Sequence, residues 1–242
     1  METPTIVLVH GFWAGPAHWG KVILELSGQG YTKIKTVDLA LTSLAEDAER
    51  TRRVLRQIDG PVLLVGHSYG GAVITEAGDE PNVVGLAYVA AFAPNAGESL
   101  GGISEKHPAE AMLAGNIVPD SDGFLWIRRE KYQESLGQDL NDDDALVMAV
   151  TQKAPLASIF GNEVSTAAWG QKPSWYQLST DDRMIHPDAQ LEMADRLKPR
   201  KLVEIQAGHA SLVSHPREIA NLIADAIADV TSIELSGEVM VP

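Results

Sequence analysis

The sequence predicts an α/β fold, with a mostly parallel six-stranded sheet flanked by helices and a small inserted cap. Short apolar runs alternate with stretches of helical periodicity, which is typical of parallel strands joined by crossover helices. This alternation stops after the fourth apolar run and resumes near residue 174. We therefore expect a core formed by residues 1–94 and 172–242, and a cap formed by residues 95–171.

The expected strands are short apolar runs that contain many β-branched residues. They cover residues 5–9, 33–38, 62–65, 83–90, 174–179 and 201–205. The expected helices show apolar residues at helical spacing, and Ser43 with Glu46 forms a capping box at the start of one of them. They cover residues 17–28, 43–58, 188–197 and 216–229, and a further helix begins just after residue 68.

The cap has a less regular pattern of scattered glycines, prolines and acids. We expect helices over residues 105–114 and 142–152, and a hairpin turn around residues 119–123. The C-terminal residues 231–242 are expected to form a loose edge strand or to be disordered.

Composition narrows the range of functions. The net charge of −14 and the pI near 4.8 argue against a nucleic-acid partner, because nothing would release counterions from a polyanion. The absence of cysteine excludes disulfides, thiolate metal sites and a cysteine nucleophile. No apolar stretch is long enough for a bilayer span, and we expect no signal peptide before the strand at Ile6. We expect a cytoplasmic protein with no membrane partner, and a homodimer is left open.

The segment Gly66-His67-Ser68-Tyr69-Gly70 interrupts an apolar run and precedes a helical stretch. A serine at such a sharp strand-to-helix turn adopts a strained backbone, which requires small residues two positions before and after it. Gly66 and Gly70 meet that requirement. The pattern therefore predicts that Ser68 is an exposed nucleophile at the start of a helix.

A serine hydroxyl needs a base, and the base needs a third group to orient it. In a parallel sheet these groups are expected in the loops that follow the strands. Asp181 and Asp182 follow the fifth expected strand, and His209 follows the sixth. The order Ser, Asp, His is therefore complete along the chain.

These motifs make the chain resemble a small serine hydrolase of the α/β-hydrolase fold, similar to the branch of bacterial esterases, plant methylesterases and hydroxynitrile lyases. The resemblance includes the turn at His10-Gly11 and implies Ser68 as nucleophile, His209 as general base and then acid, and Asp182 as the orienting acid. Asp181 remains an alternative, because the following proline stands one residue later than usual.

The oxyanion hole of this fold uses two backbone N–H groups, which implies Phe12 and Tyr69 as donors. The expected reaction is hydrolysis of small, largely apolar esters through an acyl-enzyme. Lyase, lactonase, perhydrolase and carbon–carbon hydrolase activities use the same triad and stay open, as does a receptor without activity. Gly11 favours an esterase over a hydroxynitrile lyase, which typically has threonine there and uses a lysine of the cap.

Aromatic residues on the expected loops and cap predict a pocket for the substrate. Trp13, Phe92, Trp126 and Trp169 are the candidates, although Trp126 and Trp169 could instead attach the cap to the core. We expect no cofactor and no metal, because neither His-Glu-x-x-His nor Gly-x-Gly-x-x-Gly occurs. His10 and His67 are expected to be structural hydrogen-bonding residues or pocket walls. His18, His107 and His215 are expected to be surface or helix-cap residues.

Overall fold

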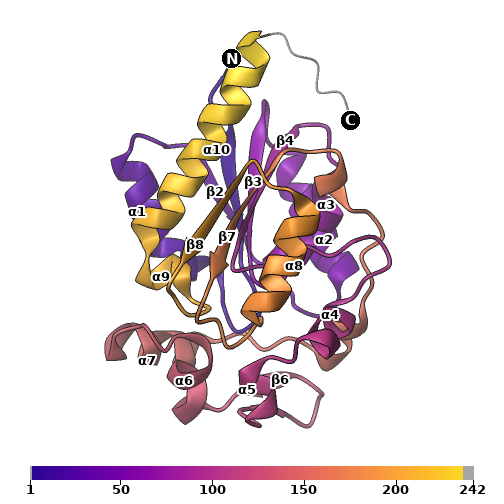
Figure 1. The fold of residues 1–242 in the computed structure, drawn as a ribbon, viewed down its shortest axis with the longest axis vertical. Coiled ribbons are helices and arrows are strands. Elements are labelled where there is room, and N and C mark those ends of the chain that lie inside the picture. Colours follow the sequence, from indigo (N-terminus) through magenta and orange to yellow (C-terminus); the bar gives the residue numbers. More distant parts are fainter. Residues whose placement is uncertain (1, 237–242) are drawn as a thin grey trace.

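A six-stranded parallel sheet forms the centre of the molecule, as the sequence predicts (Figure 1). The computed structural model describes residues 2–236. The strand order is β2-β1-β3-β4-β7-β8, and every neighbouring pair in this sheet is parallel. The strands are β1 (Thr5–Val9), β2 (Ile34–Val37), β3 (Val62–His67), β4 (Val83–Val89), β7 (Ser174–Ser179) and β8 (Lys201–Ile205).

Helices cover both faces of this sheet (Figure 1). Helices α1 and α10 lie on one face together with the short α9, whereas α2, α3 and α8 lie on the other. Because both faces are covered, β1, β3 and β7 are buried along their whole length and have no polar face. The helices are α1 (Gly20–Gly28), α2 (Leu44–Leu55), α3 (Tyr69–Ala77), α8 (Pro187–Leu197), α9 (Ser211–Ser214) and α10 (Pro216–Ser236), and the 3₁₀ helix η1 (Pro16–Trp19) precedes α1.

The chain between β4 and β7, here termed the cap segment (residues 95–171), consists of short elements. In Figure 1 its helices lie below the sheet, beyond the carboxyl ends of the strands. The hairpin expected around residues 119–123 is present as the antiparallel pair β5 and β6. The elements are α4 (Leu100–Lys106), α5 (Glu110–Leu113), β5 (Ile117–Pro119), β6 (Leu125–Ile127), η2 (Arg129–Lys131), α6 (Tyr132–Leu136), α7 (Asp142–Thr151), η3 (Ala157–Gly161) and η4 (Ala168–Gly170).

Two expectations about helices are wrong. Residues 105–114 do not form one helix, because Pro108 biases His107 to extended backbone (φ −131°, ψ 82°) and separates α4 from α5. Helix α10 does not end at Asp229 but continues to Ser236, so the first part of the C-terminal segment is neither a strand nor disordered. The remaining residues, 237–242, lie outside the described part of the chain. Within the described residues, no helix is both long and apolar enough to cross a membrane.

Candidate active site

Ser68 lies at the sharp turn between β3 and α3, as the sequence motif predicts. Its backbone has φ 57° and ψ −126°, a conformation that side-chain-bearing residues rarely adopt. The residue is buried, with 5% of its surface exposed. Because Ser68 is the N-cap of α3, the positive end of the helix dipole lies next to its hydroxyl.

Close backbone packing explains the glycines of this turn. A Cβ atom on Gly66 would lie 2.5 Å from the carbonyl oxygen of Gly70, and one on Gly70 would lie 2.5 Å from that of Val9. A Cβ atom on Gly11 would lie 2.5 Å from the Cβ atom of Ser68 and 2.9 Å from its Oγ. No other amino acid fits these three positions without movement of the backbone or of Ser68.

The three predicted triad residues lie in hydrogen-bond contact at the carboxyl ends of β3, β7 and β8. Nε2 of His209 is 2.8 Å from Oγ of Ser68, and Nδ1 of His209 is 2.7 Å from Oδ2 of Asp182. All three side chains are buried. With Nδ1 donating to the carboxylate, Nε2 can accept the proton of the serine hydroxyl.

The Asp182 carboxylate is held by four hydrogen bonds. Its Oδ1 accepts from the backbone N–H groups of Met184 (2.7 Å) and Ile185 (2.9 Å), and its Oδ2 accepts from Nε2 of Gln190 (2.7 Å) and from His209. Asp181 is exposed, and the carboxylate hydrogen-bonded to His209 is that of Asp182. The geometry therefore selects Asp182 over its neighbour.

Sequence reasoning missed Gln190, a fully buried residue of α8. Its Oε1 accepts from the N–H of Ser179, and its Nε2 donates to Asp182 and to the carbonyl of Ile185. A glutamine eight residues after an aspartate has no recognisable motif. The sequence does show that a polar residue, Gln190, stands on the otherwise apolar face of an amphipathic helix, and this is the one feature that could have pointed to it.

The predicted oxyanion donors belong to two backbone segments next to Ser68: Tyr69 follows it in the chain, and Phe12 follows Gly11, which packs against it. Tyr69 is the first residue of α3, so its N–H has no acceptor within the helix. No hydrogen bond within the described residues engages the N–H of Phe12. The rings of Phe12 and Tyr69 stack with centroids 4.1 Å apart, and the Tyr69 hydroxyl donates to the buried carboxylate of Asp47 at 2.9 Å. These contacts fix the two backbone segments that carry the donors.

The histidines nearest the triad have structural partners, as expected. Nε2 of His67 donates to the backbone carbonyl of His209 at 2.8 Å, and burial lowers the pKa of His67 well below its usual value. Nε2 of His10 accepts from the N–H of Leu39 at 3.1 Å, and burial lowers its pKa to about 4. His18 was expected at the surface but is buried, which lowers its pKa to about 4.

A cavity of about 560 Å³ opens at Ser68 between the sheet edge and the cap segment. Its walls are mainly apolar. Among the described residues, Glu105 is the one charged side chain that lines it. The apolar wall includes Phe12, Trp13, Phe92, Leu125, Phe160 and Ile185. Trp13 and Phe92 thus lie where the sequence predicted them.

Trp126 and Trp169 do not line this cavity, so their placement in the pocket is wrong. Successive residues of a strand point to opposite faces. Leu125 of β6 faces the cavity, whereas Trp126 is 38% exposed and donates through Nε1 to Asp120 at 2.8 Å. Trp169 donates to the carbonyl of Pro94 at 2.9 Å and attaches the cap segment to the exit of β4. The alternative that the sequence left open, attachment of the cap, applies to Trp169.

The chain is similar to known hydrolases in sequence and to a known esterase in fold. The chain is 27% identical over 258 residues to the alpha/beta hydrolase nvfD of Aspergillus novofumigatus, covering 96% of this chain and 100% of that protein. It is 26% identical over 247 residues to methylesterase 8 of Arabidopsis thaliana, covering 92% and 89% of the two chains. The structure of polyneuridine aldehyde esterase is similar with a TM-score of 0.79 at 21% identity, covering 93% and 99%.

The model of the alpha/beta hydrolase family matches residues 6–222. This match extends over the sheet, the predicted nucleophile, the acid and the histidine. The resemblance drawn from the sequence motifs is thus confirmed, and the chain belongs to the alpha/beta hydrolase family.

Proposed function

We propose that this protein is a serine hydrolase that cleaves neutral, largely apolar carboxylic esters through an acyl-enzyme. One observation carries the proposal: the hydrogen-bonded chain from Asp182 through His209 to Ser68 ends at an apolar cavity. The likeness to methylesterases supports an ester as the scissile group.

In the first half of the reaction, Oγ of Ser68 attacks the ester carbonyl carbon while Nε2 of His209 takes the hydroxyl proton. The carbonyl oxygen becomes an oxyanion that accepts hydrogen bonds from the N–H groups of Phe12 and Tyr69. Asp182 stabilises the imidazolium that forms. His209 then returns the proton to the departing alkoxide, so an alcohol leaves and the acyl group remains on Ser68.

In the second half, water replaces the alcohol. His209 takes a proton from the water, whose oxygen attacks the acyl carbon and forms a second oxyanion in the same site. Collapse of this intermediate breaks the bond to Ser68 and releases the carboxylic acid. The proton on His209 returns to Oγ, which restores the enzyme.

The cavity wall supports the class of substrate. Aromatic and aliphatic side chains favour an apolar acyl or alcohol group. The carboxylate of Glu105 on the wall disfavours a substrate that carries its own carboxylate, because like charges repel. A neutral ester therefore fits better than a half-ester of a dicarboxylic acid.

The structure favours an esterase over a hydroxynitrile lyase. A side chain at position 11 would collide with Ser68, so the threonine of such lyases does not fit here without rearrangement. The lysines of the cap segment are bound elsewhere: Lys106 pairs with Glu192, Lys131 with Glu134 and Lys153 with Asp38. None of the three lines the cavity.

A cytoplasmic location and a homodimer stay predictions from the sequence. The function is tested with purified protein and a panel of neutral esters, half-esters, lactones and a cyanohydrin, each compared with Ser68→Ala. We expect turnover of neutral esters that the variant lacks. Rapid cyanohydrin cleavage without ester turnover would show that the protein is a lyase and not an esterase. Tight ligand binding without any turnover would indicate a receptor.

A further inference from the structure

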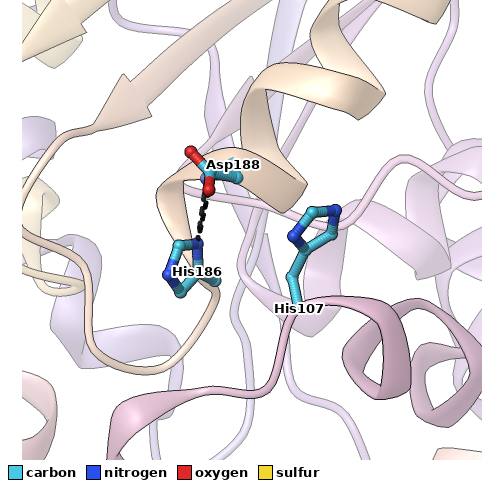
Figure 2. Close-up of side chains that lie close together, drawn as sticks. All are labelled: His107, His186 and Asp188. Carbon is cyan, nitrogen blue, oxygen red and sulfur yellow. Dashed lines mark hydrogen bonds and ion pairs between the residues drawn. The ribbon is translucent and has the colours of Figure 1, made fainter.

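Two histidines and an aspartate form a cluster beside the cavity, outside the catalytic triad (Figure 2). His107 belongs to the break between α4 and α5, whereas His186 and Asp188 lie at the start of α8 in the core. Each of the three offers one ligand atom, and these atoms all lie within 4.8 Å of one another. The rings of His107 and His186 stack with centroids 6.0 Å apart.

We propose that His107, His186 and Asp188 bind a divalent transition-metal ion such as Zn²⁺. Two imidazoles with a carboxylate are a ligand set that Zn²⁺, Ni²⁺ and Cu²⁺ prefer, whereas Ca²⁺ and Mg²⁺ prefer oxygen ligands alone. Zinc bonds of about 2.0–2.2 Å place tetrahedral ligands roughly 3.4 Å apart. Rotation of these partly exposed side chains closes the remaining distance.

The neighbouring groups suit a cation. Nδ1 of His186 accepts a 3.2 Å hydrogen bond from the N–H of Asp188 and lies 3.6 Å from its Oδ2. Oε2 of Glu192, one helical turn after Asp188, is 3.1 Å from Nε2 of His107. That carboxylate orients the imidazole or supplies a fourth ligand.

The cluster lies between the cap segment and the core, next to residues that line the cavity. Pro108 and Ala109, which follow His107, line the cavity, and so does Ile185, which precedes His186. These residues come from the cap segment and from the core. An ion held by His107 and His186 therefore ties the cap wall of the cavity to α8. The site links metal binding to the width of the substrate cavity.

The test uses untagged, chelator-treated protein titrated with Zn²⁺ in a calorimeter, with Mg²⁺ as the comparison ion. His107→Gln keeps a donor for Glu192, and His186→Asn keeps an N-cap acceptor for α8, so both variants should fold. His215→Gln is the matched control, because Nδ1 of His215 lies 3.8 Å from Oδ2 of Asp139 but belongs to no cluster of three possible ligands among the described residues. Hydrogen exchange over residues 107–113 reports the link between the cap segment and α8.

We expect one Zn²⁺ site in the wild type and in His215→Gln, and at least about tenfold weaker binding in His107→Gln and His186→Asn. Zn²⁺ should slow exchange over residues 107–113 only where both histidines are present. Equal Zn²⁺ binding by all four proteins, or several weak sites that also accept Mg²⁺, would overturn the proposal. Tight binding without slower exchange would overturn the link to the cavity.

Discussion

Two regions enclose the cavity: the loops that carry the triad, and the cap segment. They differ in how firmly their side chains are held. In the loops, backbone and buried side-chain hydrogen bonds fix each reacting group, and Ser68, Asp182 and His209 are almost entirely buried. The cap segment has short elements and leaves large apolar side chains such as Leu113 and Val147 exposed.

This difference indicates that the triad loops carry out the reaction and that the cap segment selects the substrate. Reaction chemistry requires positions accurate to fractions of an ångström, and the triad loops obtain them from the rigid sheet. Selection among substrates needs only an apolar wall of suitable shape, which the cap segment supplies through Leu125 and Phe160. Changes in the loops should therefore reduce turnover of every ester, whereas changes in the cap wall should alter preference.

The largest effect is expected from removal of the nucleophile or the base. Ser68→Ala and His209→Ala should each lower kcat by roughly four to six orders of magnitude, and the double variant should lose little more, because the two residues act as a unit. Steady-state kinetics measures this, with circular dichroism as a control for folding. Additive losses in the double variant would show that they act independently.

The acid should rank next. Asp182→Asn should lower kcat by about four orders of magnitude, because the imidazole loses the partner that fixes its tautomer. Asp181→Asn is the matched control and should retain activity, since its side chain is exposed. A large loss in Asp181→Asn with little change in Asp182→Asn would reverse the assignment.

A methyl group beside Ser68 should have a smaller effect. Gly11→Ala places a Cβ atom 2.5 Å from that of Ser68, so we expect Ser68 or the loop that carries the Phe12 N–H to shift. We expect kcat to fall by about 10²–10³, comparable with loss of one oxyanion donor. Gly15→Ala, in the same loop, has no atom within 4 Å of the added methyl and should remain active. Equal activity of both variants would contradict the close approach of Gly11.

Two adjacent residues of β6 face opposite sides: Leu125 faces the cavity and Trp126 faces the surface. Leu125→Ala should change the preference between bulky and small esters by about tenfold, because it removes apolar contacts with the larger group. Trp126→Ala should leave the preference within about twofold, since its ring points to Asp120. The reverse result would restore the placement of Trp126 in the pocket that the sequence suggested.

Much of this site could be predicted from the sequence, because the turn at Ser68 accepts only small residues at certain positions. Gly66 and Gly70 mark the turn at Ser68, and the apolar strands locate the loops that contain Asp182 and His209. Gln190 was missed because contacts made by a buried polar side chain depend on how helices pack. The orientation of Trp126 was missed because a three-residue strand gives too short a pattern to fix which face is buried.

The smallest effect is expected in the stability of the core at acidic pH. Burial lowers the pKa of His10 and His18 to about 4, so the unfolded chain binds more protons below about pH 6.5. This contribution to stability is complete above pH 6.5 and is lost as the pH falls towards 4. The urea midpoint should therefore decrease in that range, and less steeply in His18→Gln. An identical pH dependence in the variant would contradict the role of His18.

In the proposed reaction, Ser68 forms an acyl-enzyme in a pocket shaped by the cap segment. Rapid mixing with a slowly deacylated activated ester, followed by intact mass and peptide mass spectrometry, tests it directly. We predict a burst of one alcohol equivalent per active site and one acyl group on Ser68, absent in Ser68→Ala. Turnover with no burst and no adduct under conditions of slow deacylation, or an adduct on another residue, would show that Ser68 is not the nucleophile of an acyl-enzyme.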